Sequence, residues 1–180
     1  PVRDLYRRAG SIVGVNSLLY DAKQCSRILT RLAPAFDSGD LAPPASIDER
    51  PLAHGVETYP NECCGAMIGT IDGDNKTVTF ALALDNVSEG SQAARYELRP
   101  EALLRADREA RERKLDLIGI YHSHPDCGAY FSETDLKNSC PWYSFVVLSV
   151  QKGTFDHANS WLPNAEQTHA EKEELTWPES

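Results

Sequence analysis

The chain has 180 residues, enough for one globular domain with a buried core and short appendages. Hydrophobic residues make up 41% of it and charged residues 25%, which is the composition of an ordinary soluble protein. The net charge of −9 at pH 7 argues against a nucleic-acid binder, which would show basic clusters, and does not favour binding to an anionic membrane surface.

No membrane-spanning helix is expected, because the longest apolar runs, 116–121 and 145–150, are far shorter than the roughly twenty residues that cross a bilayer. The first thirty residues lack the apolar stretch and cleavage site of a secretory signal. The five cysteines are an odd number, and Cys63 and Cys64 are adjacent, which fits a disulfide framework poorly. A reducing, cytoplasmic location is therefore expected.

An amphipathic helix is predicted over 17–36, where apolar residues such as Leu18, Leu29 and Phe36 recur at spacings of three and four. The stretch that follows contains two consecutive prolines among turn-forming residues and is predicted to be a linker. Residues 1–46 are therefore expected to form an N-terminal helical appendage and linker ahead of the main domain.

A β-hairpin is predicted next, with strands over 64–71 and 76–84 around a turn at 72–75. A helix is predicted over 100–114, because Pro100 suits a first helical turn and small or apolar residues then recur among many charges. Its charged face is expected to be exposed to solvent.

A short buried strand is predicted over 116–121, and it delivers His122 and His124 at its C-terminal end. Loops at strand ends commonly carry functional residues. A short helix is expected to open at Ser132, which is a good capping residue, and to end at about Ser139.

Two further strands are predicted over 144–150 and 154–161, around a turn at Lys152 and Gly153. A polar helix or tail is expected from Pro163 onward. Strands and helices interleave along the chain, so the fold class is predicted to be mixed α/β.

His122, His124 and Asp135 form the pattern of a metal site. Imidazoles one residue apart project from the same side of a strand end, so both can reach one ion. The chain then turns, past Gly128, and can bring the carboxylate of Asp135 back as a third ligand. Three protein ligands leave a tetrahedral zinc ion one position for water, whose pKa falls to about 7. The sequence therefore predicts one catalytic Zn²⁺.

A hydrolase of this kind also needs a base that is not a ligand, and Glu62 is the candidate, because neighbouring strands would place it across from the histidines. Ser132 would lie close enough to the metal to donate a hydrogen bond to an oxyanion, although the same hydroxyl also suits a helix cap. Glu62 alone would be an ordinary exposed glutamate. Cys127 could bind the open metal position as a thiolate, sense oxidants, or be a bystander thiol.

These residues resemble the JAMM (MPN+) family of zinc metalloproteases in its compact prokaryotic form. The matching pattern is His122-x-His124-Pro125-x6-Ser132-x-x-Asp135, preceded by Glu62 in Pro-Asn-Glu-Cys-Cys-Gly. The resemblance implies a cytidine-deaminase-like α/β/α sandwich with a mixed central sheet over 47–165, followed by a C-terminal tail over 166–180. The family's usual first helix is longer than the space before Glu62 allows, so 17–36 either supplies that helix or is a separate appendage.

The resemblance also implies the role of each site residue. Zinc would be held by His122, His124 and Asp135, Glu62 would be the acid/base that activates the zinc-bound water, and Ser132 would stabilise the oxyanion. Family members cleave peptide or isopeptide bonds after the C-terminal Gly-Gly of ubiquitin or a ubiquitin-like protein. The compact form resembles prokaryotic members, some of which process sulfur-carrier proteins, so a ubiquitin-like or sulfur-carrier protein is the expected partner.

Two other functions stay open. A zinc amidohydrolase acting on a small molecule would use the same ligands, although a deaminase is disfavoured because its His-x-Glu and Pro-Cys-x-x-Cys signature is absent. A non-catalytic MPN-type binding module of the same fold would not need the intact ligand set.

Overall fold

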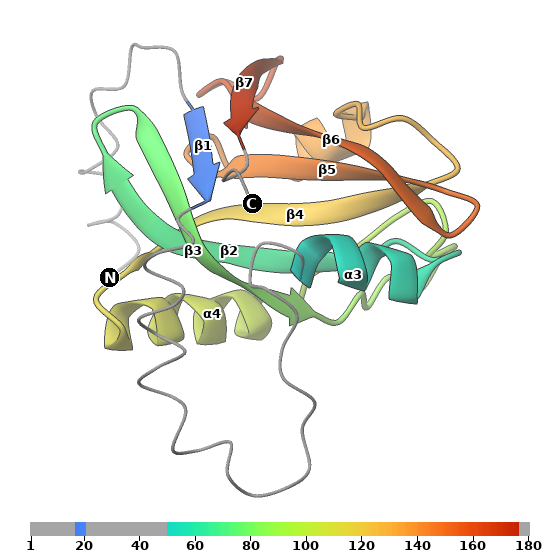
Figure 1. The fold of residues 1–180 in the computed structure, drawn as a ribbon, viewed down its shortest axis with the longest axis horizontal. Helices are drawn as coiled ribbons and strands as arrows, with labels where there is room; N and C mark the ends of the chain where they lie inside the picture. The colour runs from blue at the N-terminus through green and yellow to red at the C-terminus, as the bar shows by residue number, and fades with distance from the viewer. Residues whose placement is uncertain (1–16, 21–49, 177–180) are drawn as a thin grey trace, which may run out of the picture.

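The computed structural model describes residues 17–20 and 50–176, which Figure 1 draws in colour. In chain order the helices and strands within these ranges are β1 (Ser17–Tyr20), α3 (Arg50–Thr58), β2 (Cys64–Asp72), β3 (Asn75–Leu84), α4 (Pro100–Glu112), β4 (Asp116–Pro125), α5 (Glu133–Lys137), β5 (Ser144–Gln151), β6 (Thr154–Pro163) and β7 (Ala170–Thr176). None of the described helices has the length and apolar character needed to cross a membrane.

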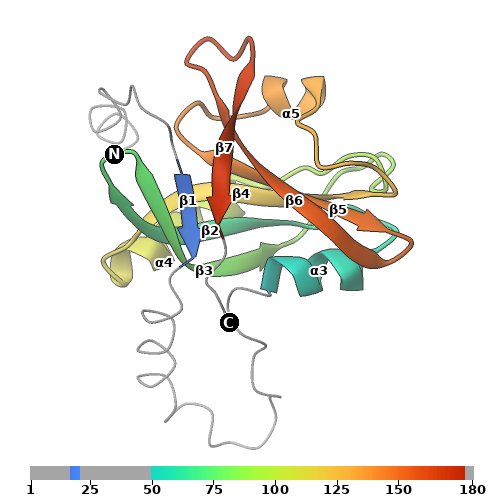
Figure 2. The same ribbon diagram turned by 45° about the horizontal axis from the view of Figure 1, so that its top comes forward.

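The strands form one mixed sheet in the order β1-β3-β2-β4-β5-β6-β7. Strand β1 pairs in parallel with both β3 and β7, so the sheet closes into a barrel (Figure 2). Strands β4 and β5 also run parallel, and the remaining neighbours are antiparallel. Strand β4, which carries the two histidines, is therefore paired along both edges, with β2 on one side and β5 on the other.

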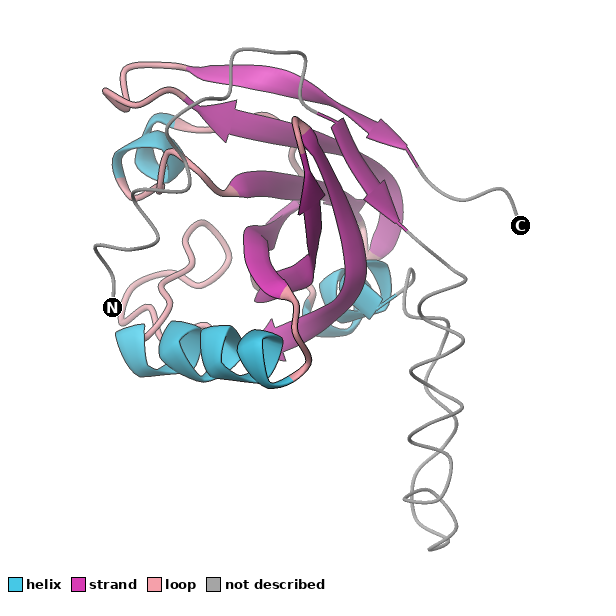
Figure 3. Ribbon diagram, turned by 90° about the vertical axis from the view of Figure 1, so that its left-hand side faces the viewer, coloured by secondary structure: helices cyan, strands magenta, loops and turns pink. Residues whose placement is uncertain are grey.

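Helices α4 and α3 cover opposite faces of the sheet (Figure 3). Ala106 of α4 packs into a buried cluster that contains Leu117 of β4. Leu52 of α3 packs against a second cluster that contains Ile118, the next residue of the same strand. Because successive side chains of a strand point to opposite faces, the two clusters are separate cores on the two sides of β4. The predicted α/β fold class with a mixed sheet is confirmed, whereas the closure by β1 was not predicted.

The elements predicted in the central part of the chain agree with the structure. The β2–β3 turn passes through Gly73, whose φ of 58° lies in the left-handed region that glycine adopts without strain. Lys152 and Gly153 both have positive φ at the β5–β6 turn, as two-residue hairpins require. Helix α4 begins at Pro100, and β4 runs on to Pro125, so both histidines lie within the strand.

Two predictions at the ends of the chain are wrong. Residues Ser17–Tyr20 form a strand rather than the start of a helix, and 21–36 lies outside the described residues. The segment after Pro163 contains strand β7 rather than only a polar helix or tail. In both places strand pairing outweighs the local pattern. Strand β1 pairs with the distant β3 and β7, and β7 pairs with the neighbouring β6 although its Glu and Lys residues have little intrinsic preference for strands. The division into 1–46, 47–165 and 166–180 stays a prediction.

A buried polar network fastens β7 to the rest of the sheet. Nζ of Lys76 donates hydrogen bonds to Oγ of Ser144 (2.8 Å) and to the carbonyl of Trp142 (3.0 Å). Ser144 in turn donates to Oε1 of Glu173 (3.0 Å), and Ser160 donates to Oε2 (2.6 Å). Burial lowers the pKa of Lys76, and the charge of Glu173 opposes that shift. The ammonium group of β3 is therefore stabilised from β7.

We expect Glu173→Ala to lower the free energy of unfolding by about 3 kcal/mol, because it removes the carboxylate that Ser144 links to the buried ammonium of Lys76 and that also accepts from Ser160. Urea denaturation at pH 7 measures the loss. Glu174→Ala, at the exposed next position of β7, is the matched control and should change stability by less than about 0.5 kcal/mol. Equal effects of the two substitutions would show that the network does not hold β7.

Candidate metal centre

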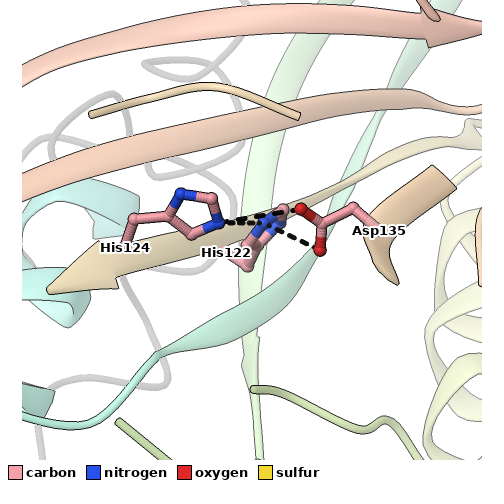
Figure 4. A group of neighbouring side chains, drawn as sticks. All are labelled: His122, His124 and Asp135. Atoms are coloured by element: carbon pink, nitrogen blue, oxygen red, sulfur yellow. Dashed lines mark hydrogen bonds and ion pairs between the residues drawn. The ribbon is translucent and has the colours of Figure 1, made fainter. Parts of the chain in front are cut away.

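The two histidines lie within the paired part of β4. His122 is opposite Cys64 of β2 and Val147 of β5, and His124 is opposite Ser149 of β5. The two side chains are 0% and 6% exposed. Since alternate residues of a strand share a face, both rings point to the same side of the sheet (Figure 4).

The structure brings the three predicted ligands together, and their ligand atoms all lie within 4.8 Å of one another. Nε2 of His122 is 3.2 Å from Nε2 of His124 and 3.4 Å from Oδ1 of Asp135. Nε2 of His124 is 3.7 Å from Oδ2 of Asp135. Atoms that bind a tetrahedral zinc ion at its usual bond lengths lie roughly 3.3 Å apart. The three residues therefore fit a zinc-sized ion, and no fourth His, Cys, Asp or Glu of the described ranges joins the group.

A capping box at the start of α5 presents Asp135. Oγ of Ser132 accepts a hydrogen bond from the backbone N–H of Asp135 (3.1 Å), and the backbone N–H of Ser132 donates to Oδ2 (2.8 Å). The hydroxyl of Ser132 also donates to Oδ2 (2.6 Å). Because Ser132 bonds to Oδ2, Oδ1 is the oxygen that remains available to a cation. The capping role foreseen for Ser132 is confirmed.

The oxyanion role of Ser132 stays a prediction. Its side chain lines the cleft beside the ligands, but its single hydroxyl proton is directed to Asp135. Donation to an oxyanion would require the hydroxyl to turn away from Oδ2, which would keep the hydrogen bond from the backbone N–H.

Electrostatic interactions favour the metal-binding protonation state at Asp135 and His122 but not at His124. Burial opposes the ionisation of Asp135, but hydrogen bonds from the two histidines and Ser132 outweigh it and hold the pKa of Asp135 well below its usual range. Burial lowers the pKa of His122, although the hydrogen bond and the charge of Asp135 act to raise it. Burial also acts to lower the pKa of His124, but Asp135 outweighs it and raises that pKa. A cation would therefore compete with a proton for His124.

The loop after β4 orients His124. The carbonyl of Cys127 accepts hydrogen bonds from side chains of β5, and the carbonyl of Ala129 accepts them from side chains of β6. Between them, the carbonyl of Gly128 lies 3.0 Å from Nδ1 of His124. Metal-binding histidines commonly donate their second N–H to such a carbonyl, which fixes the ring and leaves Nε2 for the metal.

His122 is held by a stacked ring instead. Its buried Nδ1 finds no hydrogen-bond partner among the described residues. The ring of Tyr96 stacks on the imidazole, with centroids 4.5 Å apart and an interplanar angle of 27°. Tyr96 belongs to the connection between β3 and α4, and no sequence pattern links it to His122. The stack fixes the plane of the imidazole while Nε2 faces His124 and Asp135.

Glu62 lies just before β2, on the side of the sheet that carries the ligands. Cys64 pairs with His122, so the same register places Glu62 opposite His124, as predicted. Glu62 is only 6% exposed, so it is not an ordinary surface glutamate. Burial raises the pKa of Glu62 to about 7, and smaller contributions from His124 and Asp135 act in opposite directions. A carboxyl group with this pKa can exchange a proton near neutrality.

Four of the five predicted site residues, Glu62, His124, Ser132 and Asp135, line a cleft of about 630 Å³ formed by α5, segment 93–98 and the loop after β4. The fifth, His122, is fully buried. The exposed ring of Tyr130 lies edge-on to His124, 4.9 Å between centroids. Cys127 also lines the cleft but is not in the ligand group, so its role as a ligand or oxidant sensor stays a prediction. The four cysteines in the described ranges are free thiols.

Known proteins are similar to this chain in sequence and in fold. The family model described as prokaryotic homologs of the JAB domain matches residues 44–163. A protein named desampylase from Haloferax volcanii is 38% identical over 94 residues, which cover 50% of this chain and 63% of that protein. A second desampylase, from Pyrococcus furiosus, is 27% identical over 107 residues, which cover 59% of this chain and 70% of that protein. The chain thus spans less than two thirds of the Haloferax protein.

Two proteins solved in solution have a similar fold. One, from Desulfitobacterium hafniense, has a TM-score of 0.64 at 22% identity and covers 91% of this chain and 94% of its own. The other, from Salinibacter ruber, has a TM-score of 0.57 at 32% identity and covers 74% of this chain and 88% of its own. The first likeness shows the fold alone.

We expect Tyr96→Leu to weaken zinc binding about tenfold, because the ring of His122 loses the surface that fixes its plane. Tyr96→Phe keeps the stack and should bind zinc nearly as the unsubstituted protein does. Competition with a chromophoric chelator measures the affinity without any turnover. Unchanged affinity in Tyr96→Leu would show that the stack does not orient His122.

The stability of the metal-free protein should depend on Glu62. With a pKa of about 7 in the folded state against 4.5, the folded protein keeps a proton that the unfolded chain releases. The contribution of Glu62 to stability therefore falls as pH rises from 4.5 to 7 and stays low above that. Glu62→Gln should be more stable than the parent by on the order of 2 kcal/mol at pH 8 and equally stable at pH 4. Urea denaturation with a chelator present measures this, and a difference independent of pH would contradict it.

Proposed function

Because the chain belongs to the family of prokaryotic JAB-domain homologs, we propose that it is a zinc-dependent hydrolase that cuts the peptide or isopeptide bond after the C-terminal Gly-Gly of a ubiquitin-like protein. One observation carries the proposal: a three-residue group that could hold a metal ion reaches a cleft through His124 and Asp135, and a buried carboxyl group outside that group, Glu62, lines the same cleft. Hydrolytic zinc sites combine an open metal position with such a separate base.

In this proposal His122, His124 and Asp135 hold the ion. Zinc bound there supplies a Lewis acid and lowers the pKa of water in its open position. Glu62 takes a proton from the attacking water and passes it to the leaving amine. Its pKa of about 7 suits it to both transfers, because neither form of the carboxyl group is strongly disfavoured at neutral pH.

Ser132 has two tasks in this proposal. Before the reaction it fixes Asp135 through the capping box. As charge develops on the substrate carbonyl oxygen, its hydroxyl turns from Oδ2 of Asp135 and donates to that oxygen. The backbone N–H of Ser132 stays on Oδ2, so the carboxylate keeps its orientation.

The desampylase name of two relatives supports a ubiquitin-like modifier or a sulfur carrier of the same kind as the partner. The shape of the cleft supports an extended tail, since segment 95–98 lines it without belonging to the sheet. Glycines at the end of that tail would let its backbone approach the ligands more closely than residues with a Cβ atom could. A cytoplasmic setting, predicted from the cysteines, belongs to the same proposal.

Glu62→Gln should lower kcat by about a thousandfold without changing the zinc content, because it removes the proton acceptor and leaves the ligands in place. A ubiquitin-like protein extended beyond its Gly-Gly is the substrate, and mass spectrometry locates the cut. Chelation should abolish cleavage and added zinc should restore it. Glu57→Gln, at an exposed position of α3, is the control and should cleave normally.

Each alternative outcome points elsewhere. Normal turnover by Glu62→Gln would remove Glu62 from the base role. Cleavage of a dipeptide amide but not of the fusion would indicate a small-molecule amidohydrolase. Bound zinc with no cleavage of either would indicate a binding module.

A further inference from the structure

The connection between β3 and α4, residues 85–99, is tied to the residue proposed as the base. Its second half, 93–98, lines the cleft and includes Tyr96, which stacks on His122. Its first half contains Asn86, whose side chain is partly buried. Because this segment is not a strand of the sheet, contacts other than strand pairing must hold it in place.

The side-chain amide of Asn86 makes four hydrogen bonds. Nδ2 donates to the carbonyl oxygens of Glu62 (3.1 Å) and Arg95 (3.0 Å). Oδ1 accepts from the backbone N–H groups of Ser88 (3.1 Å) and Glu97 (3.2 Å). Both hydrogens and both acceptor positions of the amide are used, and the partners define which atom is nitrogen and which is oxygen.

Glu62 is also held from its other side. Its backbone N–H donates to the carbonyl of Gln92 (2.7 Å). Nε2 of Gln92 in turn donates to the carbonyl of Asn86 (3.0 Å). The N–H and the carbonyl of Glu62 are therefore both bonded to segment 85–99, the same segment whose Tyr96 stacks on His122.

We propose that Asn86 is a positioning residue that sets the base and the wall of the cleft in one arrangement. Through the carbonyl of Glu62 it fixes where the carboxyl group meets the metal ligands, and through residues 95 and 97 it fixes the wall that carries Tyr96. The effect on turnover rests on the proposed function; the effect on the position of Glu62 does not.

Only an amide at this position satisfies all four partners. An aspartate has the same shape but no donor, so it would face the two carbonyl oxygens with a negative charge. Asn86-Val87-Ser88 also matches a glycosylation acceptor pattern, but Nδ2 is committed to two carbonyls in the fold. The amide is used for structure at this site.

Asn86→Asp is the test, and Asn164→Asp is a matched control in the turn between β6 and β7. Nδ2 of Asn164 also donates twice, to the side chains of Glu166 (2.9 Å) and Thr168 (3.0 Å). Its Oδ1 also accepts from two backbone N–H groups, those of residues 168 and 169. Each substitution removes two donated hydrogen bonds, so both should lower Tm by a similar amount.

Turnover separates the two variants. Asn86→Asp should lower kcat about 10- to 100-fold and raise KM, because both the base and the cleft wall shift, while Asn164→Asp should keep both constants. Normal kcat and KM in Asn86→Asp would reduce Asn86 to a structural role and overturn the proposal. If Asn86→Asp does not fold, Asn86→Ser, which keeps an acceptor, carries the same expectation and the same refutation.

Amide hydrogen exchange tests the position of Glu62 without substrate. The N–H of Glu62 should exchange faster in Asn86→Asp than in the parent protein, because the connection that carries its acceptor, the carbonyl of Gln92, loosens, while the amides of β5 stay unchanged. Unchanged exchange at Glu62 would overturn the proposal even if the protein cleaves its substrate. If the parent protein cleaves nothing, the proposed function fails and the exchange result alone decides the role of Asn86.

Discussion

The candidate site depends on the pairing of β4 along both of its edges. Because β2 and β5 bond to the two sides of this strand, His122 and His124 cannot shift without breaking backbone hydrogen bonds on both sides. Strand β5 runs parallel to β4, so its C-terminal end lies beside the loop that leaves β4 and supplies donors to that loop. The same pairing that buries the histidines therefore also anchors the carbonyl that orients one of them.

The two histidines are nevertheless fixed by different parts of the chain. His124 is oriented by Gly128, four residues later, through a hydrogen bond. His122 is oriented through ring stacking by Tyr96, which lies in the connection between β3 and α4. One half of the centre is thus local in sequence and the other half is not. Any movement of 85–99 would reach His122 and Glu62 together, because Asn86 joins the two ends of that connection.

This difference explains how much of the site the sequence could predict. The ligands and Ser132 fall within a short stretch whose spacing and strand-to-helix pattern carry the information, so their meeting could be predicted. Glu62 could be predicted in part, since the hairpin strand that follows it was expected to lie beside the strand that carries the histidines. Tyr96 and Asn86 could not, because a single aromatic or amide residue in a loop has no pattern until the chain is folded. Strand β1 was missed for the same reason, since both of its partners, β3 and β7, are far away in sequence. Strand β7 was missed although it pairs with the neighbouring β6, because its Glu and Lys residues do not form a strand pattern.

The surroundings of two carboxyl groups in one cleft shift their pKa values in opposite directions. Asp135 is surrounded by donors, namely two imidazoles and both the hydroxyl and the N–H of Ser132, so it stays ionised despite its burial. Glu62 is buried to a similar extent, but burial dominates there and its pKa rises to about 7. A ligand must remain an anion, whereas a group that takes and returns a proton must have a pKa near the working pH. The donors around Asp135, which are the two imidazoles of β4 and Ser132 at the start of α5, therefore separate the two tasks. They keep one carboxylate available for a cation, while Glu62, just before β2, has no such donors in the part of the chain that the structure describes and can exchange protons.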